Sequence, residues 1–225
     1  MKTPAKSSKY MTPEEIEAMV APILLRPLPE SAYVQLSAYL QLLSHWNQKI
    51  NLTAVRDPKV LVKLHLAECL RAAQRIAPGV KTVLDFGSGA GFPGIPIQVV
   101  RPDVSVTLAE SQVKKAAFLR ETVRELSLGK ASVHAGRVED MPAYSVFDVV
   151  TLRAVDKMAE AIKAAISRVR PAGGAVMVLT SRSEVPAVMS ATSSSENPET
   201  AENEWLPPDN VPGTDQRVIL TGFRI

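Results

Sequence analysis

The sequence predicts an α/β protein in which a mostly parallel β-sheet carries helices on both faces and follows a helical N-terminal segment. Three observations lead to this prediction. Residues 1–80 show helical patterns, and from residue 81 short apolar runs alternate with helical stretches. A glycine-rich turn also follows the first apolar run directly. Short strands that alternate with helices are typical of βαβ units, whose parallel strands are covered on both sides.

The N-terminal 80 residues contain three helix signals. Thr12, followed by a proline and two acids, has the composition of a helix start. The stretch ESAYVQLSAYLQLLSHW (30–46) places its apolar residues near helical spacing. A third helix is expected from Asp57 to about residue 77, where a basic turn precedes a Pro-Gly stop.

The remainder, residues 81–225, is expected to form the α/β part of one compact unit. Ser111 and Asp156 are the expected N-caps of two of its helices, and the tail QRVILTGFRI (216–225) is expected to be a late strand at the sheet edge. The polar segment 181–204 predicts a long mobile loop. Strands are expected near 81–86, 104–109, 131–135, 146–152 and 174–180, and helices near 93–101, 111–128 and 156–169.

Composition narrows the function classes. No apolar run approaches the length of a membrane span, and no apolar stretch of a secretory signal follows the basic start. The single cysteine, Cys69, and three scattered histidines give no metal-ligand spacing, and one cysteine is consistent with a reducing cytosol. Residues 1–80 hold ten Lys and Arg against six Asp and Glu. This excess is compatible with a nucleic-acid partner and equally with an ordinary solvated surface.

The stretch VLDFGSGAGFPG (83–94) contains four of the eleven glycines. One interpretation is a dinucleotide site, because Gly89 to Gly94 fits G-x-G-x-x-G and Glu110 lies at a suitable distance to hold a ribose. A Walker A loop is excluded, because no Gly-Lys-Ser/Thr follows. Two features count against a dinucleotide site. The G-x-G-x-x-G match begins late, because Gly89 lies four residues past Asp85, where the strand is expected to end. Phe92-Pro93 also lies where a phosphate-binding helix should expose N–H groups, and proline has none.

A second interpretation places glycines at every second position behind an acid: Asp85, Gly87, Gly89 and Gly91. This pattern resembles motif I of the S-adenosylmethionine-dependent methyltransferases. The resemblance implies that the loop passes under the amino-acid end of the cofactor and that Asp85 faces its ammonium group. Glu110 would hold the ribose hydroxyls in this case as well. The spacing favours the methyl donor over the dinucleotide.

Several stretches together resemble one family, the bacterial small-subunit (16S) ribosomal RNA guanine-N7 methyltransferases, also called the glucose-inhibited division protein B family. The combination of WN-x-x-x-NLT-x-x-RDP with D-x-G-x-G-x-G-x-PG is specific, and the match runs from about residue 30 to the end. The stretches are WNQKINLTAVRDP (46–58), LHLAE (64–68), LDFGSGAGFPGIP (84–96), AESQVKKAAFLRE (109–121), GRVED (136–140), LRA (152–154) and DQRVIL (215–220).

The resemblance implies a Rossmann-like fold, S-adenosylmethionine as cofactor and 16S ribosomal RNA or an assembling small subunit as partner. Gly87 and Phe92 would lie against the methionine and ribose end of the cofactor, and Val138 and Glu139 would border its adenine. Arg153 would act as the catalytic residue, at the edge between cofactor and target base. The RNA-binding candidates are Asn51, Arg56, Lys63, Lys114, Lys115 and Arg137. A monomer in the cytoplasm is expected, with no membrane partner.

The chain departs from the family at Thr180, where members commonly carry a lysine after the fifth strand. The expected chemistry needs no catalytic base, because guanine N7 is an exposed acceptor with a free lone pair. Proximity and charge management would suffice. His65 is therefore expected to be structural or to face RNA. A methyltransferase with another substrate, an NAD-dependent oxidoreductase and a non-catalytic cofactor-binding protein are the alternatives.

Overall fold

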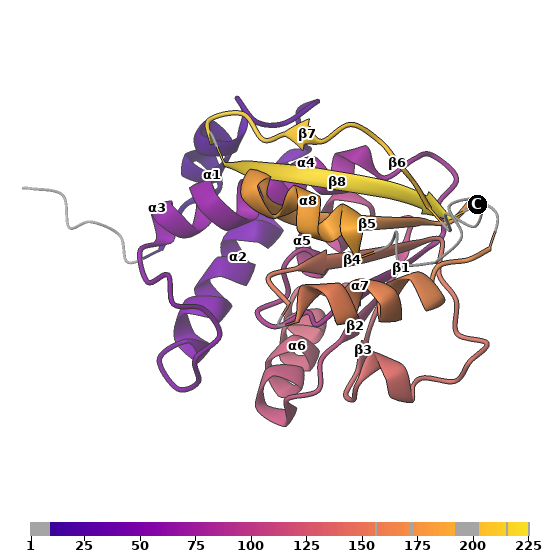
Figure 1. The fold of residues 1–225 in the computed structure, drawn as a ribbon. Helices are drawn as coiled ribbons and strands as arrows, with labels where there is room; N and C mark the ends of the chain where they lie inside the picture. The colour runs from indigo at the N-terminus through magenta and orange to yellow at the C-terminus, as the bar shows by residue number, and fades with distance from the viewer. Residues whose placement is uncertain (1–9, 156, 172, 192–202, 215, 225) are drawn as a thin grey trace, which may run out of the picture.

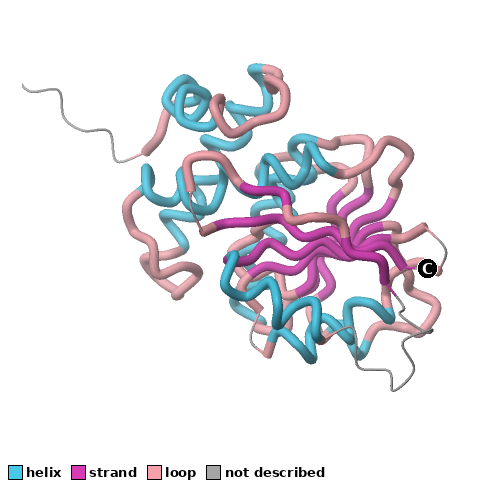
Figure 2. The backbone as a smooth tube through the Cα atoms, turned by 45° about the horizontal axis from the view of Figure 1, so that its top comes forward, coloured by secondary structure: helices cyan, strands magenta, loops and turns pink. Residues whose placement is uncertain are grey.

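The structure is a computed structural model, and it describes residues 10–224 apart from 156, 172, 192–202 and 215. Helices lie on both sides of a central sheet (Figures 1 and 2). Within the described residues, no helix is both long enough and apolar enough to cross a membrane. Asp156, one of the two expected N-caps, lies outside the described residues.

The N-terminal segment is helical, as the sequence predicts. It consists of α1 (Pro13–Val20), α2 (Glu30–Trp46), α3 (Pro58–Leu61), η1 (Val62–Leu66) and α4 (Ala67–Arg75). Thr12 and Glu15 form a reciprocal capping box at the start of α1. The third expected helix is continuous but has a π-helical turn, η1, in its middle, a feature that often marks functional sites.

The sheet has the strand order β3-β2-β1-β4-β5-β8-β6, with β7 also paired to β8. The first five of these strands are parallel, and β8 runs antiparallel to β5, β6 and β7. The late strand is therefore present, but it is not an edge strand, because β5 pairs with one side of it and β6 and β7 with the other. The strands are β1 (Thr82–Phe86), β2 (Ser105–Ala109), β3 (Ala131–His134), β4 (Val149–Arg153), β5 (Ala175–Ser181), β6 (Asn203–Trp205), β7 (Asp209–Asn210) and β8 (Arg217–Arg224).

Each face of the sheet buries its own apolar core, because alternate residues of a strand point to opposite faces. Val83 of β1 packs in the core that holds α5 (Gly94–Val100), α6 (Val113–Glu125) and the N-terminal helices. Leu84, the next residue, packs in the core that holds α7 (Met158–Ser167) and α8 (Val185–Ser190). The N-terminal helices thus share a core with the sheet.

Two local predictions were wrong. Ser111 does not cap α6, whose N-cap is Gln112 with no side-chain cap; instead the Glu110 carboxylate accepts the Gln112 N–H at 2.7 Å. The expected loop 181–204 contains the 3₁₀ turn η3 (Arg182–Glu184) and α8, because the apolar side chain of Val188 is buried against the sheet. Residues 192–202 of that segment lie outside the described residues.

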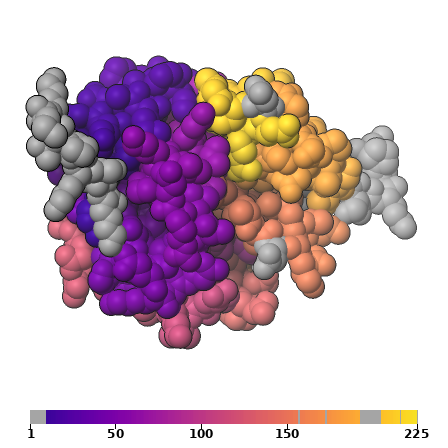
Figure 3. All heavy atoms as spheres, turned by 90° about the vertical axis from the view of Figure 1, so that its left-hand side faces the viewer, coloured from indigo at the N-terminus to yellow at the C-terminus, as the bar shows by residue number. Residues whose placement is uncertain are grey.

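The C-terminal part of the chain lies beside the N-terminal helices (Figure 3). An ion-pair cluster joins them: Asp209 of β7 accepts hydrogen bonds from Arg71 at 2.8 and 3.0 Å and from Arg75 at 2.8 Å. This cluster fixes β7, and with it the outer side of β8, against α4.

Candidate functional site

A pocket of about 630 Å³ opens at the carboxyl ends of the parallel strands. Ligands of open α/β sheets bind at this edge. The arrowhead of β4 points toward the N-terminal helices (Figure 1). The predicted residues that line the pocket are Gly87, Gly89, Phe92, Glu110, Lys115, Arg137, Val138, Glu139 and Arg153. The structure therefore brings together most of the predicted cofactor residues.

The glycine loop connects β1 to α5 and forms one wall of this pocket. Gly87, Gly89 and Gly91 all have positive φ angles, of 69°, 55° and 93°. Such angles strain any residue with a Cβ atom. A Cβ on Gly91 would also lie 2.7 Å from Ile95 Cγ1. Gly87 and Gly89 expose bare main chain to the pocket, whereas Gly91 is needed for the turn and is not part of the lining.

Asp85 lies behind the loop rather than in the pocket. Its side chain is fully buried, and it accepts hydrogen bonds from the Gly94 N–H and the Thr151 hydroxyl, both at 3.1 Å. Burial raises the pKa of Asp85 to about 6. The structure therefore does not place this carboxylate where it would face a cofactor ammonium group, because its side chain is fully buried and does not line the pocket. Asp85 instead fixes the loop to the start of α5.

The start of α5 offers no free N–H group to a phosphate. The Gly94 N–H is donated to Asp85, and the Ile95 N–H is donated to the Gly91 carbonyl at 2.8 Å. Residue 96 is a proline and has no N–H to donate. A dinucleotide site of the Rossmann type needs these groups for the diphosphate. The geometry thus argues against the dinucleotide interpretation.

Glu110 follows β2, the strand beside β1, and lines the pocket next to the glycine loop. Its Oε2 accepts the Gly89 N–H at 2.9 Å and its Oε1 accepts the Gln112 N–H at 2.7 Å. A carboxylate has about four acceptor positions, so each oxygen keeps one for a ligand. Two adjacent oxygens with fixed orientation match the two hydroxyls of a ribose.

The N-terminal helices support the glycine loop from the other side. The Tyr39 hydroxyl of α2 donates to the Ala90 carbonyl at 2.6 Å, and its ring packs edge-on against Phe92 with ring centroids 5.4 Å apart. Leu52, in the loop after α2, is part of the pocket lining. The helical segment is therefore part of the site.

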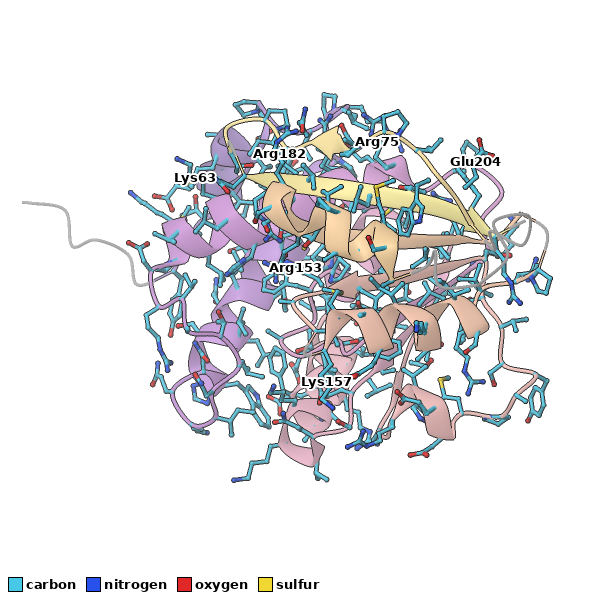
Figure 4. All side chains as sticks on the ribbon, in the orientation of Figure 1. Lys63, Arg75, Arg153, Lys157, Arg182 and Glu204 are labelled. Carbon is cyan, nitrogen blue, oxygen red and sulfur yellow. The ribbon has the colours of Figure 1, made fainter. Side chains whose placement is uncertain are left out.

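Arg153, labelled in Figure 4, enters the pocket from the end of β4. Side chains of the π-turn and α4 hold it in place. Its guanidinium pairs with Glu68 and hydrogen-bonds His65 Nδ1, and it lies 5.7 Å from the centroid of the Phe92 ring. Glu68 also accepts hydrogen bonds from Arg217 of β8 at 2.7 and 3.0 Å. Burial, followed by the charge of Arg153, lowers the pKa of His65 to about 4, so its ring is neutral at pH 7.

The predicted adenine-bordering pair lies on a short 3₁₀ turn, η2 (Val138–Asp140). Val138 is buried and apolar, and it lines the pocket together with the exposed Glu139. Lys115 of α6, Arg137 and Lys157 bring positive charge to the same pocket. Lys157 is strongly exposed and has a positive φ of 52°.

The remaining RNA-binding candidates, Asn51, Arg56, Lys63 and Lys114, do not line the pocket. Arg56 hydrogen-bonds the Asn47 carbonyl and reaches Asn51 Oδ1 at 3.5 Å. Asn47 itself ties the loop by accepting the Leu52 and Thr53 N–H groups at 2.8 and 3.0 Å. The NLT and RDP stretches thus shape the loop that carries Leu52. Lys63 and Lys114 are exposed. Figure 4 shows Lys63 on the helical side of the molecule.

The sequence interpretation missed several pocket residues, including Leu52, Val155 and Lys157. It also gave no function to Tyr39, Glu68 or Arg217. The stretches LHLAE and DQRVIL contain Glu68 and Arg217, so the signal was present without an assignment. Thr180 is buried in β5, and its hydroxyl donates to Glu184, so this position does not face the pocket.

The pocket's own groups are compatible with S-adenosylmethionine. It combines a bare glycine wall, a fixed carboxylate and an apolar floor at Val138. Among the described residues, no group of three or more His, Cys, Asp and Glu side chains could hold a metal ion.

Several solved structures share this architecture. A predicted O-methyltransferase from Agrobacterium tumefaciens superposes with a TM-score of 0.56 at 19% identity, over 72% of this chain and 81% of that chain. The TYW2 protein of M. jannaschii, in complex with AdoMet, gives a TM-score of 0.53 at 13% identity, over 70% and 75%. The protein thus has the Rossmann-like methyltransferase fold.

Sequence comparison identifies the family within this class. Residues 32–197 match the family model GidB, described as rRNA small subunit methyltransferase G. Ribosomal RNA small subunit methyltransferase G of Xanthomonas euvesicatoria is 40% identical over 163 residues, which cover 72% of this chain and 76% of that protein. The protein of the same name from Stenotrophomonas maltophilia is 40% identical over 158 residues, 70% of this chain and 68% of its own length. The chain belongs to the rRNA small subunit methyltransferase G family.

Proposed function

We propose that this protein transfers a methyl group from S-adenosylmethionine to N7 of one guanine in 16S ribosomal RNA. The observation that carries the proposal is the pocket wall made by Gly87, Gly89 and the Glu110 carboxylate at the strand ends of a methyltransferase fold. Membership of the small-subunit family supports the RNA substrate.

The residues divide the binding task among them. Gly87 and Gly89 leave room for the amino-acid end of the cofactor against the main chain. Glu110 would accept hydrogen bonds from the ribose hydroxyls, and Val138 and Glu139 would border the adenine. The cofactor supplies an electrophilic methyl group on a sulfonium.

The protein's contribution to the transfer is alignment. Guanine N7 needs no deprotonation before it attacks carbon, so a base is not required. Arg153 lies in the pocket and would orient the target base while Phe92 packs below its guanidinium. His65 is neutral and bound to Arg153, which makes it a support of that arginine rather than a proton acceptor. Holding the two reactants in line can contribute several kcal/mol, on the order of 7 or more in well-oriented model reactions.

The cations around the pocket would bind RNA phosphates. Lys115, Arg137 and Lys157 line it, and Lys63 and Lys114 are exposed elsewhere on the surface. Asn51 and Arg56 would contact RNA through the loop that they stabilise. We place the activity in the cytoplasm, carried out by a monomer on 16S ribosomal RNA or an assembling small subunit.

The test is methyl transfer from tritium-labelled S-adenosylmethionine to small ribosomal subunits from a strain that lacks this protein. Digestion of the RNA should give labelled 7-methylguanosine at one position. Arg153→Ala should lower the rate at least tenfold, whereas Arg75→Ala, whose side chain lies outside the pocket, should not. Label in protein, in a small molecule or in a different nucleoside would refute the proposed substrate. Calorimetric preference for NAD over S-adenosylhomocysteine would refute the cofactor.

A further inference from the structure

Glu68 is a buried carboxylate that connects the pocket to two distant parts of the chain. It is 1% exposed and lies in α4. One partner is Arg153 at the end of β4, whose side chain is 10% exposed, and the other is Arg217 at the start of β8. A carboxylate shared by two guanidinium groups in a buried site restricts both of them, because charge-assisted bonds to arginine have a fixed planar geometry.

His65 restrains the same arginine from a second direction. It lies three residues before Glu68, in the π-turn, so the two side chains project from one face of the helix. Its Nδ1 accepts a hydrogen bond from Arg153 Nη2. The lowered pKa of His65 keeps the ring neutral, which leaves Nδ1 available as the acceptor.

These contacts leave Nη1 as the one guanidinium nitrogen of Arg153 without a partner among the described residues. Nε is bound to Glu68 and Nη2 to His65. Nη1 is on a side chain that lines the pocket, so we infer that a ligand there can reach it. Phe92 lies against the guanidinium and limits its rotation.

We propose that Glu68 is a positioning residue for methyl transfer, which holds Arg153 so that it offers a single amino group to the target base. The inference rests on the proposed function. A free arginine binds guanine through O6 and N7 together. A donor at N7 would occupy the lone pair that must attack the methyl carbon. An arginine whose Nε and Nη2 are already bound presents Nη1, which can donate to O6 while N7 stays free.

A second cluster of one carboxylate and two arginines provides a control. Asp209 also binds two arginines, Arg71 and Arg75, and also joins α4 to a C-terminal strand. None of these three residues lines the pocket. Loss of the Asp209 cluster should lower the stability of the fold but leave the geometry of Arg153 unchanged.

The experiment compares Arg217→Met with the double variant Glu68→Gln/Arg217→Met. Glu68→Gln alone would leave two arginines without their carboxylate, which is strongly destabilising in a buried site. Arg217→Met keeps the pair of Glu68 and Arg153, and the double variant keeps the net charge of the original cluster. We expect kcat on small ribosomal subunits to be at least tenfold lower in the double variant than in Arg217→Met. KM for the subunits and the affinity for S-adenosylhomocysteine should differ less than threefold.

Two further measurements separate positioning from stability. Asp209→Asn should keep kcat within twofold even where its melting temperature falls. In spectra of ¹⁵N-arginine-labelled protein, the Arg153 Nε–H signal should be protected from exchange in Arg217→Met and lose this protection in the double variant.

Equal kcat values in Arg217→Met and the double variant would overturn the proposal, and so would a loss confined to KM. Failure of the unmodified protein to methylate ribosomal subunits would instead overturn the proposed function. In that case the arginine spectra still report whether Glu68 holds Arg153, so the two failures are distinguishable.

Discussion

The buried carboxylate of Asp85 makes a specific prediction about stability and pH. Its pKa is about 6 in the folded protein and 3.8 in the unfolded chain. Between these values the folded state holds a proton that the unfolded chain has released. Protonation of Asp85 therefore stabilises the fold fully below about pH 3.8, and this contribution is lost as pH rises through 6. At 1.36 kcal/mol per pKa unit, the loss is about 3 kcal/mol.

His65 acts in the opposite direction over nearly the same range. Its pKa falls from 6.5 to about 4 on folding, so the unfolded chain holds the extra proton and stability rises with pH between about 4 and 6.5. The two contributions partly cancel in the unmodified protein. The substitution Asp85→Asn removes only the pH-dependent contribution of Asp85 to stability. The asparagine can keep hydrogen bonds to Gly94 and Thr151, since an amide offers one acceptor and one donor group.

The assay is urea unfolding at pH 4, 5, 6 and 7, followed by the fluorescence of Trp46 and Trp205. The free energy of unfolding of the unmodified protein should fall relative to that of Asp85→Asn by roughly 2–3 kcal/mol from pH 4 to pH 7, because part of the full loss has already occurred at pH 4. The difference in unfolding free energy between the two proteins cancels the contributions of the other titrating groups. A difference that stays constant within 1 kcal/mol across this range would refute the idea that Asp85 titrates abnormally.

Three other substitutions test the support of the pocket. Gly94→Ala should lower the free energy of unfolding by roughly 3 kcal/mol in urea unfolding. The added Cβ would lie 2.2 Å from Leu108 Cδ2 and 2.6 Å from Asp85 Oδ2. A loss below 1 kcal/mol would contradict this packing. Tyr39→Phe should cost about 1–2 kcal/mol by leaving the Ala90 carbonyl without this donor, and it should weaken binding of S-adenosylhomocysteine in calorimetry. Unchanged stability would show that α2 does not support the loop. Glu110→Gln should weaken the same ligand at least tenfold, since an amide replaces one of the two acceptor oxygens; equal affinity would remove Glu110 from the ribose site.

The sequence predicted the fold well where local pattern decides structure. The five parallel strands were placed close to their observed positions, because short apolar runs bounded by turn residues form buried strands. It also predicted pocket residues at the strand ends, such as Gly87 after β1, Glu110 after β2 and Arg153 as the last residue of β4, since parallel strands end at one edge.

The sequence could not reveal contacts made by distant segments. Tyr39 reaches the glycine loop across 51 residues, and Arg217 reaches Glu68 across 149. Neither spacing leaves a local pattern. Asp85 shows a subtler limit: its position behind the loop follows from the close approach of Gly94, which only the packed structure displays. The polar segment 181–204 is another example. Part of it is helical because Val188 is buried against the sheet, and this burial is visible only in the packed structure.

The position of β8 has a consequence for synthesis of the protein. Arg217, which shares the carboxylate of Glu68, belongs to the last strand along the chain, and that strand fills the sheet between β5 and its outer neighbours. A nascent polypeptide that has emerged only as far as β5 contains the glycine loop and Arg153 but still lacks this partner and the strand that covers β5. We therefore expect the enzyme to become competent only after residues 217–224 have joined the sheet beside β5.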